Sequence, residues 1–359
     1  MHDGELAVLR VHGGVHGAEL RALALRPEQV LDFSVNVNPY GPSPSVLRAI
    51  AAAPLDRYPD PRGERACAAL GATLGEPGER VLLGHGAAEL LWSAARSLLS
   101  PGSSALIVEP TFCELRAAAL ACGARAIEWR ARAEDGFAID LLAVCAAAAR
   151  AGARVIYLCA PNTPTGSAIP AAEIAAAATS LPDMTWIVDQ SFLSLSARFA
   201  DAAVAQPANV LRVCSLTKDH AIPGLRVGYA IGDPALLQRM EAQRFAWCTS
   251  APAQAAAEAA AAAGRFVAES RSRLLADTAR TAAALRELGL RPLPSSTAFM
   301  LVPVPDALPD AAALRARLLE RQRVLVRDCA SFGLPRHIRI AARPAADCAR
   351  LIAALQQEL

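Results

Sequence analysis

The chain of 359 residues contains a single lysine, Lys218, so 35 of its 36 basic residues are arginine. An arginine side chain stays protonated in proteins, whereas a lysine amine can lose its proton and form an imine with a carbonyl compound. Around Lys218, the segment 215–226 carries Ser, Thr, Gly and Arg, the residue types that would hold a phosphate beside an imine. A surface lysine without a function is the alternative interpretation, which these neighbours disfavour.

The sequence also lacks the patterns of several other classes of protein. Its nine cysteines include no C-x-x-C pair, which argues against a disulfide framework and a zinc site and indicates a reducing cytoplasm. The net charge is +2 with no basic stripe, so we expect neither nucleic acid nor an anionic membrane as a partner. The apolar runs are interrupted by charges, and the start 1–5 does not resemble an export signal. We therefore expect a cytoplasmic protein that binds small molecules and no metal.

Short β-branched runs alternate with long helical segments rich in Ala, Leu and Arg. This alternation is typical of an α/β fold with a parallel sheet and crossover helices. The expected strands are 81–83, 105–108, 155–159, 186–188, 211–214 and 227–231. Asn162, Asp189 and Ser215 follow three of these strands closely, and open α/β sheets bind ligands beyond the carboxyl ends of their strands.

A possible phosphate site lies in the segment Gly84–Glu89, between an expected strand and the helical run 90–99. The segment has only two glycines, and no acidic ribose ligand stands at the expected distance, so a dinucleotide is disfavoured. Small residues at a helix N-terminus still let main-chain amides approach a phosphate closely. Gly86, Ala87 and Ala88 are therefore candidates to bind one phosphate group.

Five motifs then occur in order along the chain: 36–41 (NVNPYG), 57–60 (RYPD), 161–166 (PNTPTG), the Lys218 segment and 337–339 (HIR). Together they make the chain resemble the fold-type I pyridoxal-phosphate (PLP) enzymes of the class I/II aminotransferase superfamily over nearly its whole length. Within that superfamily it is similar to the histidinol-phosphate aminotransferases and the threonine-phosphate decarboxylases of cobalamin synthesis. The resemblance implies a large PLP-binding domain at 41–235 with a mostly parallel sheet, and a smaller α/β domain at 236–359. Residues 1–40 would form an N-terminal arm and part of the smaller domain.

The resemblance also implies roles around PLP. Lys218 would form the imine with the cofactor aldehyde, and Asp189 would keep the ring nitrogen protonated, which makes the ring an electron sink. Phe112 would stack on the ring, and Asn162 would donate to its phenolic oxygen. The remaining cofactor contacts would come from Gly86, Ala87, Ala88, Phe192, Ser215, Thr217, Arg226 and the partner subunit's Tyr58, so that a homodimer shares its active sites.

Plainer interpretations of these residues stay open. Asp189 has the residue type of a helix N-cap. Asn162 stands where a turn residue would precede Pro164, Phe112 would suit a core, and Tyr58 would pass as an exposed loop aromatic.

The substrate expected from the resemblance is a small phosphorylated amino acid. Arg339 matches the arginine that holds an α-carboxylate. Arg327 and His12 match positions that surround the substrate phosphate in the decarboxylase branch, and Asn38 and Asn162 complete the expected contacts. A solvated arginine at 327 and a capping or surface histidine at 12 are the alternatives.

One departure from the family pattern bears on the reaction. Many relatives have Asp-Glu-Ala-Tyr where this chain has Asp189, Gln190, Ser191 and Phe192, so a tyrosine hydroxyl is missing, and Phe112 likewise stands in place of tyrosine. These changes favour a PLP-dependent lyase that decarboxylates L-threonine O-3-phosphate to an aminopropanol phosphate for cobalamin biosynthesis. One alternative is an aminotransferase acting on histidinol phosphate or a related amine. Another is a non-catalytic dimeric scaffold, which Lys218 and Asp189 oppose.

Overall fold

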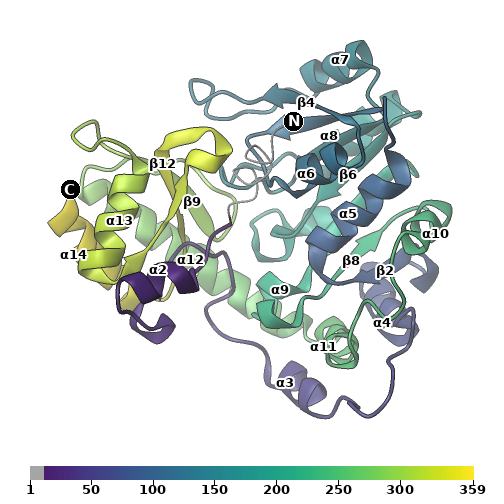
Figure 1. Cartoon of the computed structure of the whole chain (residues 1–359), viewed down its shortest axis with the longest axis horizontal. Coiled ribbons are helices and arrows are strands. Elements are labelled where there is room, and N and C mark those ends of the chain that lie inside the picture. The colour runs from purple at the N-terminus through teal and green to yellow at the C-terminus, as the bar shows by residue number, and fades with distance from the viewer. Residues whose placement is uncertain (1–11) are drawn as a thin grey trace.

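A computed structural model describes residues 12–359, so residues 1–11 of the expected N-terminal arm lie outside the described residues. Figure 1 shows two parts side by side, each built around its own sheet. The larger part holds a seven-stranded sheet and the smaller part a three-stranded sheet. The predicted α/β class is confirmed.

The seven-stranded sheet forms the centre of the larger part. Its strands, in spatial order, are β2 (Val81–Gly84), β8 (Gly228–Ile231), β7 (Val210–Ser215), β6 (Thr185–Asp189), β5 (Val155–Cys159), β3 (Ser104–Glu109) and β4 (Arg125–Arg130). Neighbouring strands are parallel, except that β8 runs antiparallel to β2 and β7. The sequence predicted all of these strands except β4, whose charged residues leave it only partly buried.

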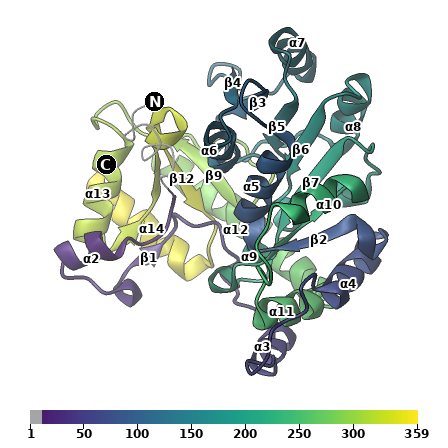
Figure 2. The same ribbon diagram turned by 45° about the vertical axis from the view of Figure 1, so that its right-hand side comes forward.

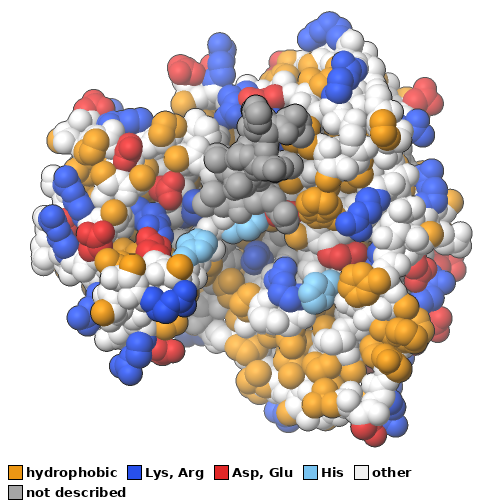
Figure 3. Space-filling view, viewed as in Figure 1, with side chains coloured by type: hydrophobic (Ala, Val, Ile, Leu, Met, Phe, Trp, Pro, Cys, Tyr) orange, Lys and Arg blue, Asp and Glu red, His pale blue; other side chains and the backbone are white. Residues whose placement is uncertain are grey.

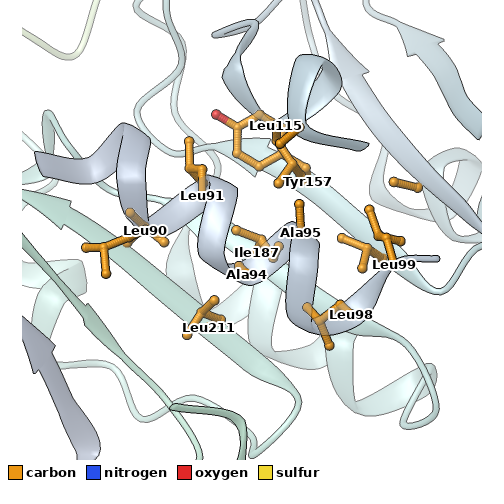
Figure 4. Close-up of a cluster of buried hydrophobic side chains, with 14 of the residues drawn as sticks. Leu90, Leu91, Ala94, Ala95, Leu98, Leu99, Leu115, Tyr157, Ile187 and Leu211 are labelled. Carbon is orange, nitrogen blue, oxygen red and sulfur yellow. The ribbon is translucent and has the colours of Figure 1, made fainter. Parts of the chain in front are cut away.

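Helices cover both faces of this sheet, because a parallel sheet is apolar on both sides. One face packs against α5 (Gly86–Leu98), α6 (Glu114–Ala121) and α10 (Pro234–Ala242), and the other against α7 (Leu141–Ala151) and α8 (Ala171–Ser180). Figure 4 shows the first face, where Leu90 and Leu115 from the helices meet Tyr157 and Leu211 from the strands. The strand ends that carry polar residues are therefore anchored in a packed core.

At the β2 edge, three further helices complete the larger part: α3 (Pro44–Ala51), α4 (Glu64–Leu74) and α11 (Ala251–Ala261) (Figure 2). Ala253 and Ala256 of α11 share an apolar cluster with Val81 and Leu83 of β2. The division expected after residue 235 differs from this packing, since α10 and α11 lie with the larger part. The small alanine side chains of α11 allow it to lie closely against its neighbours there.

The smaller part is built mainly from the C-terminal region. Its antiparallel sheet has the order β11 (Arg327–Cys329), β12 (Leu334–Ala341) and β9 (Phe299–Pro303), and its main helices are α12 (Gly264–Glu287), α13 (Ala311–Gln322) and α14 (Ala345–Glu358). The start of the described chain joins it through α2 (Gly17–Ala22) and through β1 (Leu31–Asp32), which pairs with β10 (Val324–Leu325). Phe33 is fully buried in the same core. The segment after Phe33 then crosses to the larger part.

Single-turn elements make several of the connections. They are α9 (Leu216–Asp219) and the 3₁₀ turns Pro27–Gln29, Gly78–Arg80, Leu193–Leu195, Phe199–Ala203, Pro223–Leu225 and Ala330–Phe332. Within residues 12–359, no helix combines the length and the apolar character that crossing a bilayer requires.

Candidate active site

A pocket of about 270 Å³ lies where the two parts meet, and residues of both parts line it. Figure 3 shows the corresponding face, which is hollowed between the parts and carries histidine and basic side chains around the hollow. The larger part contributes the ends of β6 and β7, the start of α5 and the segment before α6. The smaller part contributes β11, β12 and the turn between them.

Lys218 enters the pocket from α9, directly after β7. The Ser215 hydroxyl caps this turn by accepting a hydrogen bond from the main-chain N–H of Thr217 at 3.2 Å. Burial lowers the pKa of Lys218 to about 8, and the positive charges of Arg226 and Arg339 act in the same direction. A lysine with this pKa has a much larger neutral, nucleophilic fraction at neutral pH than an exposed one.

Beside Lys218 lies a corner that suits a phosphate. Ala87 and Ala88 begin α5, where helix N–H groups have no partners within the helix, and both line the pocket with Arg226 and Ser215. Gly86 keeps this corner open, because its φ is +81° and a Cβ added there would come within 2.7 Å of Nη2 of Arg226. The corner therefore combines main-chain donors, a hydroxyl and a guanidinium, which together match a phosphate dianion.

Asp189 lies at the end of β6 with its carboxylate in the pocket wall. Its Oδ1 accepts a hydrogen bond from the main-chain N–H of Ser191 at 2.8 Å. Burial raises the pKa of Asp189, while the hydrogen bonds from Ser191 and the charge of Lys218 oppose that change. Phe112 and Phe192 also line the pocket and supply flat apolar surface for a ring.

Two arginines form the wall on the side of the smaller part. Arg327 of β11 and Arg339 of β12 are direct partners in the antiparallel ladder, and both are buried. Arg339 donates from Nη1 to Thr163 Oγ1 and from Nη2 to the carbonyl oxygen of Ser34, each at 2.7 Å. Its Nε has no hydrogen-bond partner among residues 12–359, and burial lowers the pKa of Arg339 to about 10. Within residues 12–359 no carboxylate forms an ion pair with Arg339 within 4.0 Å, although the charge of Asp32 acts on it from farther away, so this wall can accept an anion.

His12 lies at the rim of the same pocket. Its Nε2 is 2.9 Å from Oε1 of Glu114, and its ring centroid is 5.6 Å from that of Phe112. The sequence predicted no metal, yet the structure brings His12, Cys113 and Glu114 together, with ligand atoms within 4.8 Å of one another. The Glu114 carboxylate also accepts a hydrogen bond from Trp92 Nε1 at 2.6 Å. These hydrogen bonds account for the arrangement of His12 and Glu114 without an ion.

Four of the predicted site residues do not line the pocket: Gly86, described above, and Asn38, Asn162 and Tyr58. Asn38 donates from Nδ2 to the carbonyl oxygen of Asp219 at 2.9 Å, so it braces the lysine turn from outside, where we had expected a substrate contact. Asn162 donates hydrogen bonds from Nδ2 to the carbonyl oxygen of Pro110 at 2.9 Å and to Thr165 Oγ1 at 3.0 Å. Tyr58 is 76 % exposed and stacks on Trp247, with ring centroids 4.4 Å apart.

The structure adds pocket residues that sequence reasoning missed, chiefly Ser34, Asn36, Thr163 and Ser331. Asn36 is buried, and neither its Oδ1 nor its Nδ2 has a partner among the described residues. It belongs to the motif 36–41, in which the resemblance assigns a substrate contact to Asn38 alone. Since both asparagines are polar and near a proline, the sequence contained no signal of which one faces the pocket.

The groups that surround the pocket match the parts of PLP. An amine of lowered pKa, a carboxylate at a strand end, two aromatic faces and a phosphate corner surround one space. The sequence profile described as aminotransferase class I and II matches residues 28–355. The chain belongs to this family. It is therefore a PLP-dependent enzyme of fold type I.

Relatives of known function include both types of enzyme named above. Histidinol-phosphate aminotransferase 2 of Ralstonia nicotianae is 35 % identical over 94 % of this chain and 91 % of its own length. Threonine-phosphate decarboxylase of Salmonella typhimurium is 33 % identical over 97 % of this chain and 96 % of its own. Among solved structures, the PLP complex of histidinol-phosphate aminotransferase from Sinorhizobium meliloti has a TM-score of 0.86 at 27 % identity, covering 98 % and 96 % of the two chains.

Proposed function

We propose that this enzyme acts on a small amino acid that carries a phosphate, and that it releases the carboxylate of L-threonine O-3-phosphate as CO₂. The observation that carries the proposal is the direct pairing of Arg327 and Arg339 in the pocket wall. Like charges opposite each other in a sheet are unfavourable. Asp328 Oδ2, 3.5 Å from Arg327 Nη1, offsets part of this repulsion, and a substrate with both a carboxylate and a phosphate would offset more of it with two anionic groups at once.

In this proposal, the cofactor roles follow the positions of the side chains. Lys218 holds PLP covalently, and Asp189 pairs with its ring nitrogen. The phosphate corner of Gly86, Ala87, Ala88, Ser215 and Arg226 holds the PLP phosphate with help from Thr217, while Phe112 and Phe192 flank the ring. When bound, PLP supplies the electron-withdrawing ring that stabilises charge left on the substrate Cα.

The substrate roles fall to the opposite wall. Arg339 would bind the carboxylate through its unpartnered Nε and hold it in one orientation. Arg327 and His12 would bind the substrate phosphate, and the buried amide of Asn36 faces the same space. As the carbon–carbon bond to the carboxylate breaks and CO₂ leaves, Lys218 Nζ would return a proton to Cα. Asn162 would need to turn from its present partners to reach the phenolic oxygen.

We further propose a homodimer with shared active sites. Large apolar side chains are exposed on and beside α3 and in the segment before α11: Leu47, Leu55, Tyr58, Phe245 and Trp247. Figure 3 shows hydrophobic side chains gathered on the lower part of this face, over α3 and α11. A second copy that covers this patch would bring Tyr58 to its partner's phosphate corner.

All nine cysteines are free thiols, which supports a reducing compartment such as the cytoplasm.

Transamination of histidinol phosphate or a related amine is the second candidate. Its support is the set of relatives, in which histidinol-phosphate aminotransferases reach 35 % identity against 33 % for the decarboxylase. On sequence similarity alone, the relatives favour this reaction over decarboxylation. Histidinol phosphate has no carboxylate, so in that half-reaction Arg339 would have no partner from the substrate.

Product analysis separates the two reactions. With O-phospho-L-threonine and no 2-oxo acid, we expect CO₂ and a phosphorylated amine in equal amounts. Turnover of histidinol phosphate that requires 2-oxoglutarate, without CO₂ release from O-phospho-L-threonine, would establish the aminotransferase instead. A protein that binds no PLP and has neither activity would match the scaffold alternative.

The carboxylate role is tested with two matched arginine variants. Arg339→Ala should lower turnover about 100-fold, because a misplaced reacting group costs rate of that order. Arg343→Ala is the control, since Arg343 lies outside the pocket and binds Asp347 at 2.8 Å. Equal losses in both variants would remove the role assigned to Arg339.

A further inference from the structure

A buried polar chain runs beneath the pocket, on the side of the sheet that faces the core. Tyr157 and Cys159 lie on the same face of β5, since side chains two residues apart in a strand point the same way. The Tyr157 hydroxyl is 3.2 Å from Cys159 Sγ, and the Thr111 hydroxyl is 3.1 Å from the same sulfur. Thr111 Oγ1 also lies 3.0 Å from Asn162 Oδ1. These four side chains are nearly or fully buried.

The other end of this chain reaches Asp189. Cys159 and Asp189 are direct partners in the β5–β6 ladder, and the Tyr157 hydroxyl lies 3.5 Å from Oδ2 of the carboxylate. That distance is at the long end for a hydrogen bond, and such bonds shorten when an active site is filled. The main-chain N–H of Ser191 donates to Oδ1, and a hydrogen bond from the Ser191 side chain also lowers the pKa of Asp189, while Tyr157 is the donor that approaches Oδ2 from β5.

Tyr157 is otherwise surrounded by hydrocarbon. Figure 4 shows it among apolar side chains that include Leu115 and Leu91, and none of its surface is exposed. A buried hydroxyl costs free energy unless it is hydrogen-bonded, and a phenylalanine would suit such a core better. We therefore expect the Tyr157 hydroxyl to form a hydrogen bond that contributes to the function of this site.

We propose that Tyr157 is a positioning residue for Asp189, whose hydroxyl donates to Oδ2 and keeps the carboxylate ionised and oriented toward the PLP ring nitrogen. This inference rests on the proposed pairing of Asp189 with PLP. Burial favours the neutral acid, and a hydrogen bond to the charged form opposes that effect. Because burial also raises the pKa of Tyr157 well above its usual value, the phenol remains a donor at every working pH.

Several titratable groups around Asp189 affect its protonation and must be considered in a test that varies the pH. From β5, Tyr157 and Cys159 face it, and from β7, Cys214 contributes; burial raises the pKa of each thiol to about 12, so all three groups are neutral. From α9, Lys218 is the charged group that acts on the carboxylate. Lys218 is the same in every variant below, so its own titration cancels when variants are compared.

The test measures the dissociation constant of free PLP for the apoprotein between pH 5 and 8. For Tyr157→Phe, the ratio of its constant to that of the unaltered protein should be near one at pH 8. It should rise on acidification to about threefold to tenfold, because Asp189 without this donor takes up a proton at a higher pH. A ratio that is the same at every pH would overturn the inference while leaving the proposed function intact.

Two further variants test whether the effect is specific to the Tyr157 hydroxyl. Tyr229→Phe is the control, since its hydroxyl on β8 lies beside Cys214 and its ratio should stay near one throughout. Cys159→Ala keeps the phenol but removes the sulfur between Tyr157 and Thr111, and should give a smaller rise in the same direction. If the unaltered protein binds no PLP, the proposed function fails and this inference fails with it.

Discussion

The main-chain N–H of Asn38 donates to the carbonyl oxygen of Lys218 at 2.8 Å. The Asn38 side chain adds a second bond, from Nδ2 to the carbonyl oxygen of Asp219 at 2.9 Å, and accepts from the N–H of Tyr40 at 3.1 Å. The N-terminal segment is thus fastened to the turn that presents the only lysine. This segment also supplies Ser34 and Asn36 to the pocket.

Asn38→Ala removes the side-chain bonds and leaves the carbonyl of Asp219 without this donor. We expect a loss of about 1–3 kcal/mol in the free energy of unfolding, measured with urea. We also expect slower formation of the covalent bond with PLP, because the turn carrying Lys218 is less well held. Asn209→Ala is the control: its amide braces the turn around Met184, and it should lower stability without slowing PLP attachment. Equal effects of both variants on PLP attachment would contradict a positioning role for Asn38.

Lys218→Arg should keep the fold and the charge yet abolish turnover, because a guanidinium does not form an imine. In the unaltered enzyme, borohydride reduction and peptide mass spectrometry should place the pyridoxyl group on Lys218. A label found at the amino terminus would contradict the central assignment.

The rate of PLP attachment to the apoprotein should depend on pH through Lys218. Only the neutral amine attacks the aldehyde, and the pKa of Lys218 is about 8. The rate should therefore rise about tenfold per pH unit below pH 8 and level off above it. The charge of Arg339 helps to lower this pKa, so Arg339→Ala should move the midpoint to higher pH. Stopped-flow absorbance measures both curves, and a midpoint near the ordinary lysine value would contradict the burial argument.

A mixture of two inactive variants tests the shared active site. Tyr58→Ala and Lys218→Ala, expressed together, should form heterodimers with one intact site and one doubly altered site. Activity should partly return, up to about half per heterodimer. Heterodimers shown to form by tagged purification but without recovered activity would rule out the contribution of Tyr58 across the dimer.

Much of the fold follows from local patterns in the sequence. The strands that end at Asp189 and Ser215 are short runs rich in β-branched residues and followed by polar residues, a pattern typical of buried strands. Strand β4 was not predicted because Arg125, Glu128 and Arg130 interrupt its apolar residues, so that it is neither a continuous apolar run nor a strict alternation. The boundary expected after residue 235 would put α11 with the smaller part, whereas its alanines pack against β2; an alanine-rich helix does not reveal its packing partner.

The sequence by itself determined the chemistry that needs one residue type: the solitary Lys218, the carboxylate of Asp189 and the family to which their motifs belong. The tertiary structure alone decided which groups meet. It paired Arg327 with Arg339, turned Asn36 rather than Asn38 into the pocket, and placed the Tyr157 hydroxyl beneath Asp189. The physical reason is that residue type is local, whereas strand register and the facing of side chains depend on packing between segments far apart in the chain.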